Sequence, residues 1–562
     1  MRAPRPYTSE PADPTELSPS GRWRAVKQAG LVLLAAAWVV LGLVGHDPWK
    51  VEDARTFGLA WDVVQHGDFI VPRLAGEDYL AQPPLLPDLG ALAIRAFGNL
   101  LEPFDAVRVV CGVLLAGILL FSALASRELN GRAYRWLPVL LLIGSVGLWD
   151  RAHALSPELG LTAGITLALY GLALALRRPI AGGVAIGSGI AVAFASRGFL
   201  GPAWVLLTLA LLPAMGPLWR TRAHAVTAGV AVAIGLVACA WWPYLLHARD
   251  PALLDGWLDG ESIGHYIAWP WADAAAPTYF PRNLLWFAWP ALPLVAWMLW
   301  TRGRGFNGGL RQPGVQVPGL MALVMLASLA LYPDPRVVYA LPLLPPLALL
   351  GALEVDSLAR GFSAALDWFG ILTFGLLAIV VWGIWIDARL YGMSPLVAGL
   401  FRDTEIGYQP SFHLGAVLAA VFLTVLWVML VRPARRSNRR TLLNWAAGVT
   451  LVWCLYSTIW LPYLDSRRSY RHVVESSAVH LPERGCVASR NLGESQRALW
   501  FYFTGLVTVR EETHPQQDCL AMLVQYGRQE GVPPEIPGWF VTWDGRRRGD
   551  DTERYVLYRR AR

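Results

Sequence analysis

Charged side chains are scarce in this sequence, and lysine is almost missing. Only 16% of the 562 residues are charged, whereas 55% are hydrophobic and the mean hydropathy is +0.40. One soluble core could not bury that much apolar surface, so the composition excludes an ordinary soluble domain and predicts a polytopic membrane protein. Of the 48 basic residues only Lys27 and Lys50 are lysines. We therefore interpret the net charge of +7, carried by arginine, as a signal of membrane topology and not of nucleic-acid binding.

Long apolar runs are spread along most of the chain. A run of about 17 to 25 residues is needed to cross a bilayer roughly 30 Å thick. Thirteen candidate spans lie near 27–45, 105–126, 135–149, 158–176, 181–196, 199–215, 224–246, 284–301, 316–332, 337–354, 364–386, 412–431 and 442–462. Residues 1–26 precede them, are rich in Pro and Ser near their start and lack an apolar core, so we predict a disordered cytoplasmic tail.

The positions of arginine predict the orientation of these spans. Basic residues concentrate in the cytoplasmic loops of membrane proteins. With a cytoplasmic N-terminus, every strong Arg cluster falls in an inner connection, the last being RPARRSNRR at 432–440. This holds only if Pro83–Gly98 does not cross the membrane, so we predict a surface helix there, within a first periplasmic loop at 46–104 that carries juxtamembrane helices. An odd number of spans then places the C-terminus on the outer side of the membrane.

The composition changes abruptly after the last span. Residues 463–562 are polar and contain the strand-like runs CVASR, LVTVRE, CLAMLVQYG, WFVTW and RYVLYRR, with one helical stretch, SQRALWFYF. These patterns predict a small periplasmic α/β domain. Cys486 and Cys519 both fall in it, while the other three cysteines lie in apolar spans. In an oxidising periplasm the pair could form a disulfide, and two buried free thiols are the alternative.

Carboxylates gather on the predicted outer face. Glu52 and Asp53 follow the first span, and Arg55 shares a helix face with Glu52 at a spacing of three residues. Glu158 enters span 158–176 at its outer end, where Pro157 can begin the helix. Charges at the edge of the hydrocarbon are costly and usually face a cavity or a partner. The alternatives are a solvated amphipathic helix for the first-loop acids and a plain membrane-boundary residue for Glu158.

Two arginines on the outer side run against the positive-inside trend. Arg197 and Arg336 each stand alone between apolar runs. Guanidinium groups suit bidentate phosphate binding, so an anionic ligand near the interface would account for both. Snorkelling to lipid head groups is the alternative for each.

The order of these features resembles the GT-C glycosyltransferases. It comprises the Glu52-Asp53 pair, then GDF-x-x-P-x-x-x-G-x-x-Y-x-x-x-PPL, then Arg108, then an acidic residue in the second outer loop. Within this superfamily the chain is most similar to the bacterial branch that contains the lipid A aminoarabinose transferases and relatives of the protein O-mannosyltransferases. The similarity covers about Trp49 to Pro346. It implies a GT-C catalytic membrane domain at 27–462, with about 13 transmembrane helices, followed by the small periplasmic α/β domain.

The resemblance implies an enzyme that moves a sugar from a polyprenyl-phosphate donor, typically undecaprenyl phosphate, to an acceptor on the periplasmic face. The implied acceptor is lipid A, lipopolysaccharide or another envelope glycan. A protein O-mannosyltransferase-like enzyme is one alternative, and a non-enzymatic lipid or solute transporter or an inactive paralogue are others. The chain has no Gly-rich phosphate loop and no Asp-x-Asp motif, which argues against a soluble nucleotide-sugar site. The expected partners are the lipid-linked donor, a lipid or glycan acceptor and membrane lipids, without nucleic acid.

The resemblance also assigns individual residues. The family's acidic motif, Asp-Glu followed by Ala/Thr-Arg-Tyr, stands here as residues 52–56 with the two acids exchanged, and its second-loop Asp corresponds to Glu158. The catalytic candidates are therefore Glu52, Asp53 and Glu158, and the substrate-binding candidates are Arg55, Tyr79, Gln82, Arg197, Arg336 and Tyr339. Gln82 replaces a family Lys and loses its charge, which predicts a changed substrate or a silent site. No cofactor is assigned; a divalent cation between Glu52 and Glu158 stays open, although no close ligand spacing supports it.

Overall fold

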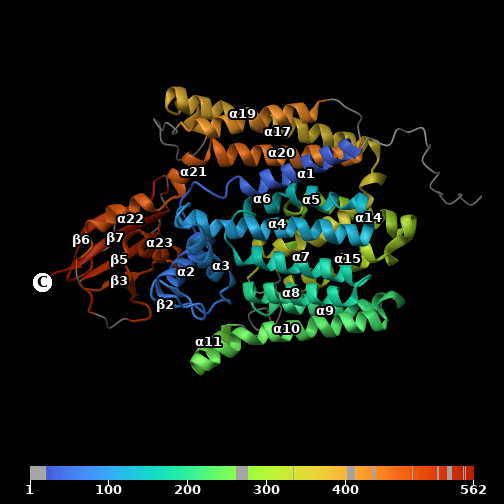
Figure 1. The fold of residues 1–562 in the computed structure, drawn as a ribbon. Helices are drawn as coiled ribbons and strands as arrows, with labels where there is room; N and C mark the ends of the chain where they lie inside the picture. Colours follow the sequence, from blue (N-terminus) through green and yellow to red (C-terminus); the bar gives the residue numbers. More distant parts are fainter. Residues whose placement is uncertain are drawn as a thin grey trace, which may run out of the picture.

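The computed structural model describes residues 21–260, 276–332, 334–400, 412–432, 437–483, 485–514, 518–527, 535–548, 550 and 552–561. Long helices pack side by side into a bundle, and an α/β domain covers one end of it (Figure 1). Most of the predicted tail lies outside the described residues. Helix α1 (Gly21–Val40) already includes the last residues of that segment, so the predicted disorder does not extend to residue 26.

Apolar helices make up the bundle. In chain order they are α1, α4 (Pro103–Asn130), α5 (Leu137–Ile143), α6 (Val146–Arg151), α7 (Pro157–Ala175), α8 (Pro179–Arg197), α9 (Leu200–Met215), α10 (Arg222–Arg249), α13 (Ala276–Phe287), α14 (Ala291–Gly303), α15 (Pro313–Leu329), α16 (Leu344–Gly351), α17 (Arg360–Tyr391), α19 (Leu414–Val431) and α20 (Asn438–Thr458). Short 3-10 turns connect several of them: η1 (Arg132–Tyr134), η2 (Pro217–Trp219), η3 (Phe306–Arg311), η4 (Val337–Leu343) and η5 (Ala352–Ser357). Helices α17, α19 and α20 form a layer along one side (Figure 1).

The chain is a multi-pass membrane protein. Seven described helical segments are long and apolar enough to cross a membrane, or up to nine if each of two strongly bent pairs is one span. Three shorter apolar helices, Ala25–Val40, Leu200–Met215 and Pro313–Leu329, coincide with further predicted spans. Every one of the thirteen predicted segments is largely helical where it is described. Their number as true crossings stays a prediction.

The predicted span at 135–149 is broken in two. Helix α5 ends at Ile143 and α6 begins at Val146, so neither piece could cross a bilayer alone. The break lies at Gly144, where a Cβ would come within 2.6 Å of the Trp445 ring and where the Trp445 indole donates to the Gly144 carbonyl at 3.0 Å. A side chain from α20 thus occupies the space that a continuous helix would need.

The first loop folds onto one end of the bundle. It contains α2 (Glu52–His66), a short hairpin of β1 (Arg73–Leu74) and β2 (Glu77–Asp78), and α3 (Leu85–Phe97). Gly67 ends α2 in the left-handed conformation, with φ at 75°, which suits glycine. Helix α3 confirms a helix within the predicted segment at 83–98, and it packs against α2 and α4. Its position along the membrane surface stays a prediction.

The C-terminal residues form the predicted α/β fold. After the short helix α21 (Leu461–Arg468) come α22 (Arg471–Ala478), β3 (Val487–Arg490), α23 (Glu494–Thr504), β4 (Thr508–Arg510), β5 (Ala521–Gly527), β6 (Trp539–Gly545) and β7 (Glu553–Arg560). The sheet has the order β4-β3-β5-β7-β6, with β3 parallel to β4 and β5, and β7 antiparallel to β5 and β6. A disulfide joins Cys486 and Cys519, which confirms the pairing over the alternative of two free thiols.

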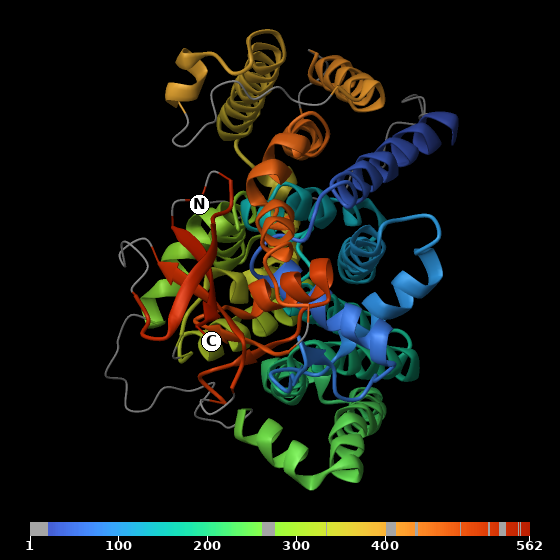
Figure 2. The same cartoon turned by 90° about the vertical axis from the view of Figure 1, so that its left-hand side faces the viewer.

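Ionic contacts connect the α/β domain to the start of the first loop. The Arg471 guanidinium donates to the Asp47 carboxylate, with Nε to Oδ2 at 3.0 Å, and Lys50 pairs with Glu553. Glu553 also accepts from the hydroxyls of Tyr470 at 2.7 Å and Tyr555 at 2.6 Å. The view from this end shows the C-terminal domain in front of the bundle (Figure 2), and its helix α23 packs on α2 of the first loop. The domain is therefore attached at the same end of the bundle as α2.

Helices α7 and α8 pack in close contact and position the next charged groups. A Cβ on Gly164 would meet the Ala193 nitrogen at 2.6 Å, and a Cβ on Gly189 would meet the Gly164 oxygen at 2.6 Å. Such small residues allow two membrane helices to approach backbone to backbone. Because the two helices run antiparallel, the start of α7 and the end of α8 lie together. This brings Glu158 beside Arg197.

Two further short helices follow long helices of the bundle. Helix α11 (Pro251–Gly260) follows α10 directly, and Trp257 on it is buried against Trp242 and Phe194. Helix α18 (Pro395–Leu400) follows α17. The segment 261–275 after α11 lies outside the described residues.

Candidate active site

The two acids at the start of α2 lie in different surroundings. Glu52 and Asp53 occupy the first turn of the helix, where carboxylates interact favourably with the helix dipole. Successive residues of an α-helix point about 100° apart, so neighbours face different elements. The Glu52 side chain is 30% exposed, whereas that of Asp53 is 8% exposed. The predicted catalytic pair is therefore divided into one accessible and one buried carboxylate.

Both oxygens of Asp53 are engaged within the protein. The buried Arg108 of α4 donates from Nη2 to Asp53 Oδ2 at 2.7 Å. The backbone N–H of Leu155, two residues before α7, donates to Asp53 Oδ1 at 2.6 Å. Asp53 thus connects α2 to α4 and to the loop that leads into Glu158. In this arrangement it is suited to positioning and not to accepting a proton from a substrate.

Glu52 is paired with Arg55 one helical turn away. Arg55 donates from Nη2 to Glu52 Oε2, as the three-residue spacing predicted. Its other terminal nitrogen, Nη1, donates to Oε2 of Glu494 at 3.2 Å. Glu494 lies in the first turn of α23 in the C-terminal domain. One guanidinium is thus shared by carboxylates from two domains.

A second charged group lies where α7 begins and α8 ends. Arg197 Nε is 3.6 Å from Glu158 Oε1, and the Glu158 side chain is 7% exposed. The Arg197 guanidinium carbon also lies over the Tyr339 ring, 5.4 Å from its centroid. Arg336 precedes this tyrosine by one turn and forms an ion pair with Asp334, with Nη2 to Oδ2 at 2.8 Å. The predicted residues from α7, α8 and the start of η4 therefore form one group.

Tyr79 and Gln82 follow the hairpin in the chain, and Tyr79 lies within electrostatic reach of Arg55 and Glu52. Both residues are buried, at 9% and 5% exposure. The hairpin is held by α23, because Arg497 donates from Nη1 to Glu77 Oε2 at 3.0 Å and from Nη2 to the Leu74 carbonyl at 3.4 Å. Gln82 lies in the segment between the hairpin and α3. The C-terminal domain therefore supports the elements that carry two predicted substrate-binding residues.

The electrostatics join these groups into one site. Burial raises the pKa of Glu52; the Arg55 guanidinium opposes this shift and the Glu158 carboxylate adds to it. Burial also raises the pKa of Tyr79 to about 12, against the opposing charge of Arg55, so its phenol keeps its proton at neutral pH. The hydrogen bond to Asp334 raises the pKa of Arg336, and the charge of Glu52 contributes to the same shift. Carboxylates and guanidinium groups that are far apart in the sequence thus interact electrostatically at this corner.

Two participants were missed by reasoning from the sequence. Glu494 lies 439 residues from its partner Arg55, and no local pattern distinguishes it from other exposed acids of the C-terminal domain. Arg108 was noted as a motif residue, but its pairing with Asp53 depends on the packing of α4 against α2. Pairs of residues that are distant in the sequence produce no periodic pattern from which they could be predicted.

The described residues do not favour the metal site that stayed open. Among them, no three His, Cys, Asp or Glu side chains come close enough together to hold a metal ion. Glu52 and Glu158 each lie beside a guanidinium group instead, Arg55 and Arg197 respectively. Positive charge at this corner is therefore supplied by arginine.

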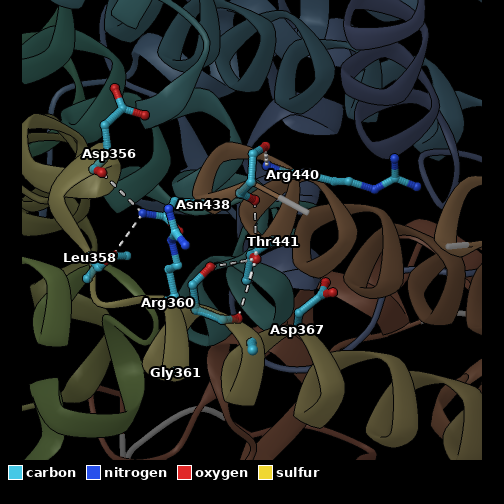
Figure 3. A pocket seen from close by; sticks show the side chains of 11 residues that line it. Asp356, Leu358, Arg360, Gly361, Asp367, Asn438, Arg440 and Thr441 are labelled. Atoms are coloured by element: carbon cyan, nitrogen blue, oxygen red, sulfur yellow. Dashed lines mark hydrogen bonds between the residues drawn. The ribbon is translucent and has the colours of Figure 1, made fainter. Parts of the chain in front are cut away.

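A polar pocket of about 650 Å³ lies elsewhere, between the starts of α17 and α20 (Figure 3). Its carboxylates are satisfied by the protein itself. Asp356 accepts from Arg439 at 2.8 and 2.6 Å, and Asp367 accepts from the Asn444 amide at 2.8 Å. None of the residues that line it is a predicted site residue. We therefore place the candidate active site at the α2 corner and not in this pocket.

Known proteins provide an independent comparison. No protein-family model matches the chain. It is similar to the undecaprenyl phosphate-alpha-4-amino-4-deoxy-L-arabinose arabinosyl transferase of Pseudomonas paraeruginosa, with 28% identity over 359 residues that cover 62% of this chain and 63% of the relative. The corresponding transferase of Serratia proteamaculans is 24% identical over 450 residues, which cover 77% and 76%. The chain thus spans slightly less than two thirds of the first of these relatives.

Solved structures extend the similarity to nearly the whole chain. The crystal structure of ArnT from Cupriavidus metallidurans bound to undecaprenyl phosphate matches with a TM-score of 0.66 and 15% identity, over 96% of this chain and 98% of that one. The same protein in the apo state matches with a TM-score of 0.66 and 16% identity. The chain therefore has the GT-C membrane fold, and the resemblance drawn from its sequence motifs is confirmed.

Proposed function

We propose that this protein is an integral membrane glycosyltransferase that moves a sugar from a polyprenyl-phosphate donor to an acceptor at the periplasmic face of the bacterial inner membrane. Residues 27–462 form the catalytic membrane domain, and residues 463–562 form a periplasmic domain. The N-terminus is cytoplasmic. The donor class is supported by the similar transferases, whose names specify undecaprenyl phosphate-linked 4-amino-4-deoxy-L-arabinose. The proposed acceptor is lipid A, lipopolysaccharide or another envelope glycan, as the resemblance in the sequence motifs implies.

The observation that carries this proposal is the joint placement of carboxylates and guanidinium groups at the α2 corner of a GT-C fold. Glu52 is accessible, and its raised pKa makes its carboxylate a stronger base than an ordinary glutamate. Arg197 and Arg336 supply positive charge within electrostatic reach of it. These are the two kinds of group that sugar transfer from a lipid phosphate requires.

The reaction is a displacement at the anomeric carbon. The acceptor oxygen attacks that carbon, the bond from the carbon to the phosphate oxygen breaks, and the bonding pair leaves with the polyprenyl phosphate. An acceptor hydroxyl gives its proton to Glu52, and an acceptor phosphate needs little base catalysis. Arg197 and Arg336 neutralise the charge that develops on the leaving phosphate, because preorganised cations stabilise such charge without reorganisation. Attack from the face opposite the phosphate inverts the configuration.

The other site residues prepare this geometry. Asp53 fixes α2 against α4 through Arg108 and fixes the loop before α7 through Leu155. Glu158 orients Arg197, and Tyr339 stacks under the same guanidinium. Tyr79 keeps its proton and can donate a hydrogen bond to the donor phosphate or sugar. Gln82 is neutral and can bind a sugar hydroxyl without adding charge.

The test is a transfer assay with the purified full-length protein in lipid. Candidate donors are radiolabelled undecaprenyl-phosphate-linked sugars, beginning with 4-amino-4-deoxy-L-arabinose, and candidate acceptors are lipid A, lipopolysaccharide and an envelope glycan. We expect wild-type protein to transfer label and, with an acceptor that reacts through a hydroxyl, Glu52→Gln to lose at least about a hundredfold in kcat, the contribution of a general base. The control is Glu102→Gln, an exposed carboxylate before α4. Transfer that survives Glu52→Gln together with Asp53→Asn would overturn the proposed site.

A further inference from the structure

Helix α23 brings the C-terminal domain into the candidate active site. The helix begins after Gly493, and Glu494 is the acidic residue of its first turn. It packs closely on α2, since a Cβ on Gly58 would lie 2.5 Å from the Ala498 Cβ. Arg497, one turn after Glu494, is buried and bound to the hairpin through Glu77. Glu494 is thus held at the site by contacts on both sides of the helix.

The shared guanidinium is the point of contact between the two domains. Arg55 uses one terminal nitrogen for Glu52 and the other for Glu494, and its own side chain is 19% exposed. The three groups carry a net charge of −1 when both carboxylates are ionised. A guanidinium has its donors in a planar fork, so it can serve two carboxylates at once. How strongly the Arg55 guanidinium neutralises Glu52 therefore depends on how strongly it also binds Glu494.

Removal of the Glu494 charge would change that division. Arg55 would then act on Glu52 alone, and an opposite charge within about 4 to 6 Å favours the ionised form of a carboxylate. A carboxylate stabilised in this way is a weaker base. The other groups that act on Glu52 would remain: Glu158 from α7, Arg197 from α8, Arg336 before η4 and Tyr79 after the hairpin. Only the contribution from the C-terminal domain would be lost.

We propose that Glu494 is a positioning residue that keeps Arg55 shared between two carboxylates, so that Glu52 remains available as the base. This inference rests on the proposed function. It assigns the C-terminal domain a part in the chemistry, in addition to its cover over the membrane domain. It also predicts that a change in the contact between α23 and α2 alters the rate and pH dependence of transfer without a change in the membrane helices.

The experiment measures kcat for sugar transfer as a function of pH in the full-length protein. Glu494→Gln should move the acidic limb of the profile to lower pH and reduce kcat at its plateau about two- to fivefold, as expected for one partly exposed charge pair. Glu494→Asp keeps the charge and should retain the wild-type limb. Glu494→Lys reverses the charge and should move the limb further in the same direction. Glu475→Gln is the matched control, because it is a half-exposed acid of the same domain.

The outcomes separate this inference from the proposed function. If Glu52→Gln abolishes transfer while the limb stays in place across the Glu494 series, the inference is wrong and the proposed function stands. A fall in kcat with no shift of the limb also overturns it, because a purely structural role would produce that result. If Glu52→Gln transfers sugar at the wild-type rate, the proposed catalytic role itself fails. Thermal unfolding of each variant verifies that it is folded.

Discussion

Asp53 accepts a hydrogen bond from Arg108 at 2.7 Å, and this buried pair joins the first-loop helix α2 to the membrane helix α4. The side chains are 8% and 2% exposed. Arg108 also lies over the Phe104 ring, with its guanidinium carbon 4.3 Å from the ring centroid. Glu52, the residue before Asp53, is more exposed, at 30%, and pairs with Arg55 instead of Arg108. Two adjacent acids therefore have different expected functions.

We expect Asp53→Asn to destabilise the protein and Glu52→Gln to spare it. Loss of the Asp53 charge leaves Arg108 buried without its carboxylate, which costs about 3 to 5 kcal/mol in comparable buried pairs. The check is thermal unfolding of both variants in the same detergent, beside kcat for transfer. Equal losses of stability in the two variants would contradict a structural role for Asp53 that Glu52 does not share.

The stability difference between wild type and Glu52→Gln should depend on pH. The folded-state pKa of Glu52 is raised by burial, so folding favours its protonated form. Its contribution to stability is therefore complete below the ordinary Glu pKa of about 4.3 and is lost as pH rises through the folded value. Glutamine does not ionise, so the stability of the variant does not fall in this way. The melting temperature of Glu52→Gln should therefore rise relative to that of wild type as pH increases from 4 to 8. A difference that stays constant across that range would contradict the raised pKa.

Arg197 should contribute to donor binding through its guanidinium. Hydrogen bonds to charged groups contribute about 1.5 to 3 kcal/mol, so Arg197→Gln should lower kcat/KM for the lipid-linked donor about tenfold or more. Arg197→Lys should recover part of that loss, because it restores the charge without the bidentate fork. Arg178→Gln, at the other end of α8, serves as the control. An unchanged kcat/KM in Arg197→Gln would show that Arg197 does not bind the donor.

The disulfide should stabilise the C-terminal domain. Cys486 and Cys519 lie 33 residues apart, and closing a loop of that length stabilises a fold by about 3 to 4 kcal/mol in the chain-entropy model. We expect the double substitution to serine to lower the unfolding temperature of this domain, measured by limited proteolysis during heating. Substitution of Cys239, which is outside the pair, should leave it unchanged. Equal protease resistance in the double variant would contradict this expectation.

The orientation can be tested with introduced cysteines. Val479 in the C-terminal domain is 85% exposed, and Leu310 in η3, a predicted cytoplasmic connection, is 44% exposed. In a background without Cys239, a membrane-impermeant maleimide should label Val479→Cys in cells with a permeabilised outer membrane. Leu310→Cys should react only after lysis. Labelling of both positions in intact inner membranes would overturn the predicted topology.

Much of the fold could be predicted from local patterns. Runs such as 364–386 and 412–431 are apolar over the length of a bilayer, and helix formation there satisfies the backbone without help from distant residues. The strands at CLAMLVQYG and RYVLYRR were likewise visible as short runs rich in β-formers, and they pair as β5 and β7. The break between α5 and α6 could not be predicted, since Trp445, which fills it, lies on α20.

For the candidate site, the sequence alone determined which residue types stand at the end of each span, because charge at a membrane boundary is visible in the order of residues. It predicted the pairing of Glu52 with Arg55, which are neighbours on one helix turn, whereas Arg336 and Tyr339 were assigned through the resemblance. The tertiary structure alone decided that Asp53 is buried against Arg108 while Glu52 stays accessible, and that Glu494 shares Arg55. The physical reason is that hydrogen bonds and burial depend on distance in space, and these partners are brought together only by the packing of α4 and α23 on α2.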